Sequence, residues 1–61
     1  MNRIDPSLNP LEVMLVCEDL EKRGYTGYSL ALGNNCIWAQ LYQFNLYYIF
    51  QDSKILDVQT D

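Results

Sequence analysis

The sequence predicts an α+β fold in which one N-terminal helix packs on a three- to four-stranded antiparallel sheet. Helix start and stop signals frame residues 9–24, and the apolar pattern changes to period two after residue 27. In addition, residues 25–51 contain none of the twelve charged side chains but all eight aromatic ones. A chain of 61 residues is long enough for one domain only, so residues 1–61 are expected to form a single small domain with an N-terminal arm over residues 1–8.

The helix is predicted over residues 10–23. Asn9 suits the N-cap and Pro10 the first helical position, and Glu12 at N3 completes a capping box. At the other end, Gly24 suits the left-handed position that follows a helix, and the two residues before it are basic, as the helix dipole favours. Both ends of the helix are therefore defined by local sequence.

Helical spacing divides the apolar residues of this segment into two groups. The group expected to face the core comprises Val13, Val16, Cys17 and Leu20. A narrower stripe of Leu11 and Leu15 points the other way. Two explanations for this stripe stay open: the N-terminal arm folds back over it, or a second protein chain binds there.

Four strands of an antiparallel meander are predicted over residues 27–32, 36–43, 46–51 and 54–59. The turns between them fall at residues 33–35, 44–45 and 52–53, where Gly, Asn and Asp tolerate positive φ. In the middle strands the residues on both sides of the alternation are apolar, and one helix covers only one face of a sheet.

The second face of this sheet is then either a tyrosine-rich face in contact with water or a surface that binds another chain. The uncharged run also lacks the Lys, Glu or Pro that usually protect open sheet edges, which favours binding by a face or an edge. The residues expected at this interface are Trp38, Tyr42, Tyr47, Tyr48 and Phe50, with Leu11 and Leu15 as a secondary site.

Catalytic chemistry finds little support in the sequence. There is no histidine, so Cys17 and Cys36 lack the base that activates a cysteine nucleophile. No phosphate loop, dinucleotide fingerprint or calcium-loop spacing occurs. We therefore expect a non-enzyme without cofactor or metal. The two cysteines are expected to be reduced thiols, with a disulfide between them as the alternative.

The net charge of −4 argues against direct binding to nucleic acids or to anionic membranes. Four acidic residues cluster on the predicted helix: Glu12, Glu18, Asp19 and Glu21. They either serve solubility or form an acidic rim that docks on a basic partner. The chain shows no secretion signal and no apolar run long enough to span a bilayer, so a cytoplasmic protein is expected.

These observations together predict a small acidic protein–protein interaction module. The expected activity is to inhibit or regulate a host protein, including one that handles nucleic acids, by occupying its surface. Proteins of this size and charge are encoded by phages and mobile elements, an analogy that rests on size and charge alone. A homodimer is also expected. The alternatives are a self-assembling structural subunit and a small-ligand binder with an aromatic pocket at a dimer seam.

Overall fold

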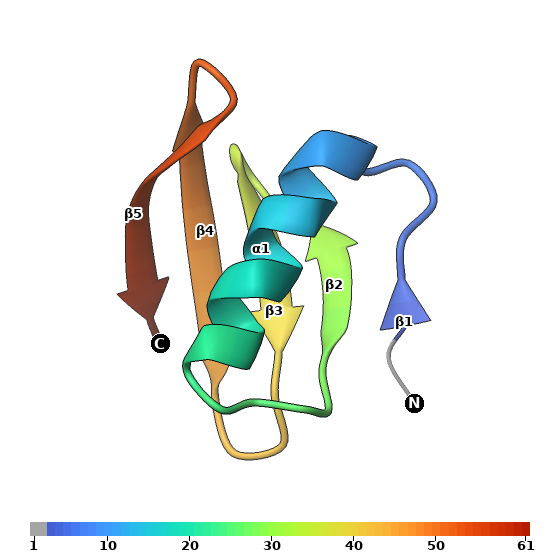
Figure 1. Ribbon diagram of the computed structural model, residues 1–61, viewed down its shortest axis with the longest axis vertical. Helices are drawn as coiled ribbons and strands as arrows, with labels where there is room; N and C mark the ends of the chain where they lie inside the picture. The colour runs from blue at the N-terminus through green and yellow to red at the C-terminus, as the bar shows by residue number, and fades with distance from the viewer. Residues whose placement is uncertain (1–2) are drawn as a thin grey trace.

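Five strands and one helix follow one another along residues 3–61, the part of the chain that this computed structural model describes. In chain order they are β1 (Arg3–Ile4), α1 (Pro10–Lys22), β2 (Ser29–Leu32), β3 (Cys36–Gln40), β4 (Asn45–Gln51) and β5 (Lys54–Thr60). The strands form one sheet in the order β1-β2-β3-β4-β5, and α1 lies across one face of it (Figure 1). The predicted α+β fold is confirmed.

The helix begins where the sequence predicts. Asn9 is the N-cap, and its side-chain oxygen accepts a hydrogen bond from the backbone N–H of Leu11 at 2.9 Å. Pro10 occupies the first turn, where its missing N–H is not needed. Leu8, just before the cap, is buried in the core and fixes the direction in which the chain enters α1.

The helix ends in a Schellman motif. The N–H of Tyr25 bonds to the carbonyl of Leu20, and the N–H of Gly24 bonds to the carbonyl of Glu21, both at 3.0 Å. Gly24 has φ of 91°, the left-handed conformation that its lack of a Cβ permits. The last helical residue is Lys22, one residue before the predicted end.

The N-terminal arm differs from the expectation. Residues 3–4 form β1 and pair in parallel with β2, so the sheet has a fifth strand that the sequence pattern does not reveal. The chain then crosses to the helix side, and α1 connects the two parallel strands. Leu11 keeps 50% of its surface exposed, so the arm does not fold back over it. Residues 1–2 lie outside the described part of the chain.

The loop between β3 and β4 spans residues 41–44, whereas the sequence predicts a strand through residue 43 and a turn at residues 44–45. Leu41 and Phe44 close this loop with a backbone hydrogen bond of 3.0 Å, and both side chains pack against the core. The ring of Phe44 also meets Tyr25 edge-to-face at 5.6 Å. Tertiary packing therefore forms a loop from residues that individually favour strands.

The other two turns form where predicted. Asn35 has φ of 60° in the β2–β3 turn. Asp52 and Ser53 have φ of 54° and 62°, which gives the two-residue type I′ connection that suits the twist of a hairpin. The register of the two strands shifts between Ile49 and Phe50, because Leu56 is an extra residue on β5, and this bulge bends β5.

The core lies between α1 and the sheet. Val16 and Leu20 are fully buried on the helix, and Val13 and Cys17 pack beside them, which confirms the predicted core face of the helix. The buried residues are Leu8, Val16, Leu20, Tyr28, Leu30, Ile37, Ala39, Leu46 and Tyr48. The buried residues on the sheet side of the core all lie between Tyr28 and Tyr48, within the uncharged run of residues 25–51. This run therefore supplies the sheet side of the core.

Candidate protein-binding face

The alternation of side chains in β3 and β4 gives the sheet two different faces. Ile37 and Tyr48 point to α1 and are buried, whereas Trp38 and Tyr47 point away from it and are half-buried. In the described part of the chain no helix lies against this second face, because α1 covers the first. We name it the open face. Its central residues are Ser29, Ala31, Cys36, Trp38, Tyr47 and Ile49.

Two stacked aromatic rings occupy the centre of the open face. Trp38 and Tyr47 are cross-strand partners, and their ring centroids lie 6.4 Å apart at an interplanar angle of 19°. Beside them is a hollow of about 430 Å³ that Cys36 and Ile49 help to line. A stacked aromatic pair next to an apolar hollow is typical of the anchors in protein interfaces.

The indole N–H of Trp38 has no hydrogen-bond acceptor. Among residues 3–61, its Nε1 is the only buried side-chain nitrogen or oxygen in this condition. A buried donor without an acceptor costs about 1–3 kcal/mol. The ring is therefore stabilised by any rearrangement that brings an acceptor to Nε1, and a binding partner is one source of such an acceptor.

Polar groups close one end of the open face. Asn45 donates a hydrogen bond of 2.8 Å from its side-chain amide to Asp61 Oδ2, and the Tyr47 hydroxyl donates to the same oxygen at 3.3 Å. Partial desolvation of the Tyr47 hydroxyl and the nearby charge of Asp61 raise the pKa of Tyr47. Tyr47 thus remains a neutral donor, and the C-terminal residue is fixed to this end of β4.

The predicted interface residues do not gather on one surface. Trp38 and Tyr47 lie together on the open face, whereas Tyr48 and Phe50 belong to the helix side of the sheet. Tyr42 is 98% exposed in the β3–β4 loop, away from both faces. Because Tyr48 and Phe50 pack in or against the core, only Trp38 and Tyr47 are available to a partner at the open face.

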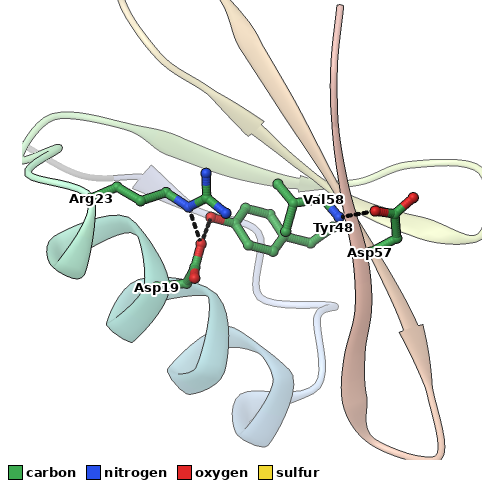
Figure 2. Close-up of polar contacts among 5 residues, drawn as sticks. All are labelled: Asp19, Arg23, Tyr48, Asp57 and Val58. Carbon is green, nitrogen blue, oxygen red and sulfur yellow. Dashed lines mark hydrogen bonds and ion pairs between the residues drawn. The ribbon is translucent and has the colours of Figure 1, made fainter.

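Tyr48 instead takes part in a polar cluster beneath the helix, which Figure 2 shows. Its hydroxyl donates to Asp19 Oδ2 at 2.6 Å, and Arg23 Nε reaches the same oxygen at 2.6 Å. Burial of the carboxylate raises the pKa of Asp19, but the hydrogen bonds from Tyr48 and Arg23 outweigh it, and the pKa is lower than usual. Burial and the bond to Asp19 both raise the pKa of Tyr48.

The predicted secondary site lies on the outer side of α1. Leu11 and Met14 each keep 50% of their surface exposed, and Leu15 is half-buried beside Ile55 of β5 in a hollow of about 210 Å³. Of the predicted acidic rim, Glu18 and Glu21 are exposed, Glu12 is half-buried, and Asp19 is engaged with Arg23 and Tyr48. The rim around these apolar residues is therefore made by the three glutamates.

The edges of the sheet are protected, which corrects the expectation of unprotected ones. The uncharged run forms the internal strands β2, β3 and β4, while the edges are β1 and β5. Strand β1 has only two residues and is followed by Pro6. Strand β5 carries charged residues, and Asp57 Oδ1 accepts the backbone N–H of Val58 at 2.9 Å (Figure 2). Edge-to-edge pairing thus loses its basis.

The direction of the Val58 N–H follows from the β4–β5 ladder. The N–H of Asp61 bonds to the carbonyl of Asn45, so every second residue of β5 from Asp61 backwards points its backbone groups toward β4. Val58 falls between these positions and points its N–H away from the sheet. Asp57 therefore covers a donor that would otherwise be free for another strand.

The two cysteines are free thiols in different environments. Cys36 lies on the open face, and Cys17 lies on α1 beside Tyr28, where a hydrogen bond between the two and burial raise the pKa of Tyr28 to about 12. No group of three or more potential metal ligands gathers within residues 3–61. In the same residues, no helix is both long enough and apolar enough to cross a membrane.

In comparisons with known proteins, no family model, no curated protein and no solved structure matches this chain. The class that fold and surface define is therefore a small α+β domain with one covered and one open sheet face.

Sequence reasoning named Trp38 and Tyr47 but missed that small Ser29 and Ala31 share their face. The alternation within residues 27–32 contained this signal, since it separates the small residues from Leu30.

Proposed function

We propose that this chain is a small non-catalytic protein–protein interaction module that inhibits or regulates another protein molecule by occupying its surface. The open face is the binding surface in this proposal. One observation carries it: the Trp38–Tyr47 stack and its hollow lie on a sheet face that α1 does not cover. Half-buried aromatic rings of this kind bind strongly once a partner excludes water from them.

The distribution of charge indicates what kind of surface the open face binds. No charged side chain lies in its centre, and the charged residues at its margins are two basic and two acidic: Arg3, Lys54, Asp57 and Asp61. A strongly basic partner gains little at a face of this composition. The surface that suits the open face is apolar, with a polar margin of mixed sign.

The outer side of α1 supports a second candidate function. Leu11 and Met14 are half-exposed among acidic residues, and a basic protein surface complements such a site. In this second proposal, the outer side of α1 binds a host protein that handles nucleic acids, of the kind that phage and mobile-element inhibitors bind. Both proposals place the protein in the cytoplasm, where free thiols such as Cys17 and Cys36 persist.

Photo-crosslinking tests the open face directly. A photoreactive phenylalanine analogue replaces Trp38 in one variant and Tyr42 in a control, and each variant is irradiated inside the cells that express it. We expect a protein adduct from position 38 and little from position 42, because Tyr42 is more exposed but lies off the open face. Equal yields at both positions, or no adduct at position 38, would rule out the open face as the binding surface.

A further inference from the structure

Bulk is distributed unequally across the open face. Its residues on β4, Tyr47 and Ile49, are large, whereas those on β2, Ser29 and Ala31, are small. The largest side chain, Trp38, belongs to β3, the middle strand of the five. The face therefore has a raised side over β4, a low side over β2, and a central ring between them.

Charge is distributed unequally as well. Arg3 of β1 pairs with Ser29 of β2. The same cross-strand row continues through Gln40 of β3 to Asn45 of β4. Asp61 binds Asn45 at the far end of this row. A basic and an acidic residue thus mark the opposite ends of one row, at the two edges of the sheet that β1 and β5 form in Figure 1.

We propose that the open face binds a second copy of this chain, face to face, about a two-fold axis that runs parallel to the strands over β3. This inference rests on the proposed function, in which the open face binds protein. The rotation places β4 of each copy over β2 of the other and β1 over β5. The result is a four-layer arrangement with the two sheets inside and the two helices outside.

The size distribution favours this axis over the alternative. With the axis along the strands, Tyr47 of each copy meets the low side at Ala31 of the other, so large residues face small ones as in well-packed layers. An axis perpendicular to the strands places β4 over β4 and β2 over β2. The two raised sides then collide and a gap remains over the two low sides.

The charges are compatible with the axis along the strands. Rotation about a line parallel to the strands keeps each row at its height and exchanges its ends, so Arg3 of one copy approaches Asp61 of the other. The perpendicular axis keeps β1 against β1 and β5 against β5, so it separates Arg3 from Asp61 and brings Lys54 of one copy toward Asp61 of the other. Opposite charges at the margin of an apolar centre fix the orientation of an interface.

A face-to-face dimer of this kind needs the whole of the open face. The two longer dimensions of the Cα trace, 28 and 22 Å, span the sheet as viewed in Figure 1. Stable protein interfaces bury about 800 Å² on each partner. That amount is just under a fifth of the 4384 Å² surface of the chain. In the dimer, the hollow beside Trp38 of one copy receives the Trp38 side chain of the other copy.

The first test measures mass against concentration. Light scattering coupled to size-exclusion chromatography of the full chain should approach twice the 7.1 kDa chain mass at micromolar concentration. Trp38→Ala should raise the dissociation constant at least about 30-fold, the effect of a hot-spot residue, while Tyr42→Ala leaves it unchanged. A chain that stays monomeric at every concentration overturns the inference.

The second test uses the native thiols and does not depend on a variant that folds poorly. Cys36 lies on β3 close to the proposed axis, so the Cys36 thiols of the two copies face one another across the sheets. A short bismaleimide should link wild type and Cys17→Ser into covalent dimers but not Cys36→Ser. Linkage that depends on Cys17 instead contradicts this arrangement.

The third test exchanges bulk between the two strands. Ala31→Tyr should clash with Tyr47 of the other copy, Tyr47→Ala should leave a gap, and each should weaken the dimer about tenfold or more. The double variant should recover most of the affinity, because the large and the small side chain have then exchanged strands and Trp38 keeps an aromatic neighbour. Equal weakening in the double variant rejects the axis along the strands.

The tests separate this inference from the proposed function. If the chain is monomeric and position 38 crosslinks to a different protein, the open face binds protein but its partner is not a second copy. If the chain is monomeric and position 38 yields no adduct, both proposals fail. A dimer whose mass and Cys36 linkage match the expectations, with the adduct at position 38 at twice the chain mass, supports this inference and the role of the open face in binding protein, and it leaves inhibition of a different protein to the outer side of α1.

Discussion

Tyr47 and Tyr48 are neighbours in the sequence, yet their rings lie on opposite faces of the sheet. Tyr48 is fully buried under α1 and donates a hydrogen bond to Asp19. Tyr47 stacks on Trp38 at the open face and reaches Asp61 at its margin. The two residues have the same chemistry, so the difference between them comes from which face the helix covers.

This comparison shows how one residue type takes on two functions in a small domain. On the helix side, tyrosine fills the core, and its hydroxyl reaches a carboxylate at the edge of the core. On the open face, tyrosine forms a rigid apolar surface that tolerates water until a partner arrives. A substitution at each position should therefore affect a different property of the protein.

The largest expected effect is on stability. Tyr48→Ala should lower the free energy of unfolding by about 3–5 kcal/mol, the usual loss for a large buried aromatic, and leave little native protein. Tyr47→Ala should cost clearly less, because its ring is only half-buried. Urea unfolding followed by far-UV circular dichroism, at the lowest usable concentration so that association contributes least, compares the two. Equal losses would mean that both faces are core.

Removal of one hydroxyl should have a smaller, pH-dependent effect. Tyr48→Phe loses a hydrogen bond to a charged group, worth about 1.5–3 kcal/mol at neutral pH. The pKa of Tyr48 is raised in the folded protein, so wild type loses stability as pH rises above about 10, where only the unfolded chain ionises. Tyr48→Phe should lose less stability over that range.

The acid side has the opposite sign. The pKa of Asp19 is lowered in the folded protein, so its contribution to stability is present above about pH 4 and is lost as pH falls below that value. Tyr48→Phe should reduce this loss, because one of the bonds that lower the pKa of Asp19 is gone. The control is Tyr42→Phe in the exposed β3–β4 loop. If the two variants show the same pH profile from acid to alkali, the cluster beneath α1 is not its source.

A third prediction concerns the end of the open face. A Cβ at Gly33 would lie 2.7 Å from Cys36 Sγ, so Gly33→Ala must displace the thiol and should cost about 1 kcal/mol. Replacing Cys36 by Ala in the same chain should restore most of the loss. Gly27→Ala, which meets no atom within 4 Å, serves as the matched control in thermal unfolding. An unchanged melting temperature for Gly33→Ala would contradict the contact.

The smallest expected effect on stability is at the β5 edge. Asp57→Ala should change the free energy of unfolding by no more than about 0.5 kcal/mol, as at most surface sites. It exposes the N–H of Val58, so aggregation followed by light scattering should become faster. Asp57→Asn removes the charge but keeps an acceptor, and it should aggregate more slowly than Asp57→Ala. Equal rates would attribute the protection to charge alone.

Local signals were sufficient to predict the helix. The N-cap at Asn9, the left-handed Gly24 and the type I′ turn at residues 52–53 each depend on residues close in sequence. Strand β1 could not be predicted, because its two residues gain their partners only from β2, far along the chain. The loop over residues 41–44 was missed for a related reason, since its packing against Tyr25 outweighs local preference.

The candidate site was predictable in part. The alternation correctly separated Trp38 from Ile37 and Tyr47 from Tyr48, but alternation does not say which set the helix covers when both are apolar. The absence of charge from residues 25–51 reflects the position of β2, β3 and β4 inside the sheet. Charged residues then remain for the helix and the edges, where water reaches them.

The two-residue strand β1 has a consequence for how the chain can be handled. The backbone of Arg3 and Asp5 bonds to Tyr28 and Leu30, and these contacts are what shields the uncharged strand Ser29–Leu32 on that side. A protease that clips the first five residues, or a tag that pulls them away, would leave a neutral apolar ribbon open to add further strands. Fibril growth would then start at β2, while the side guarded by Asp57 stayed inert.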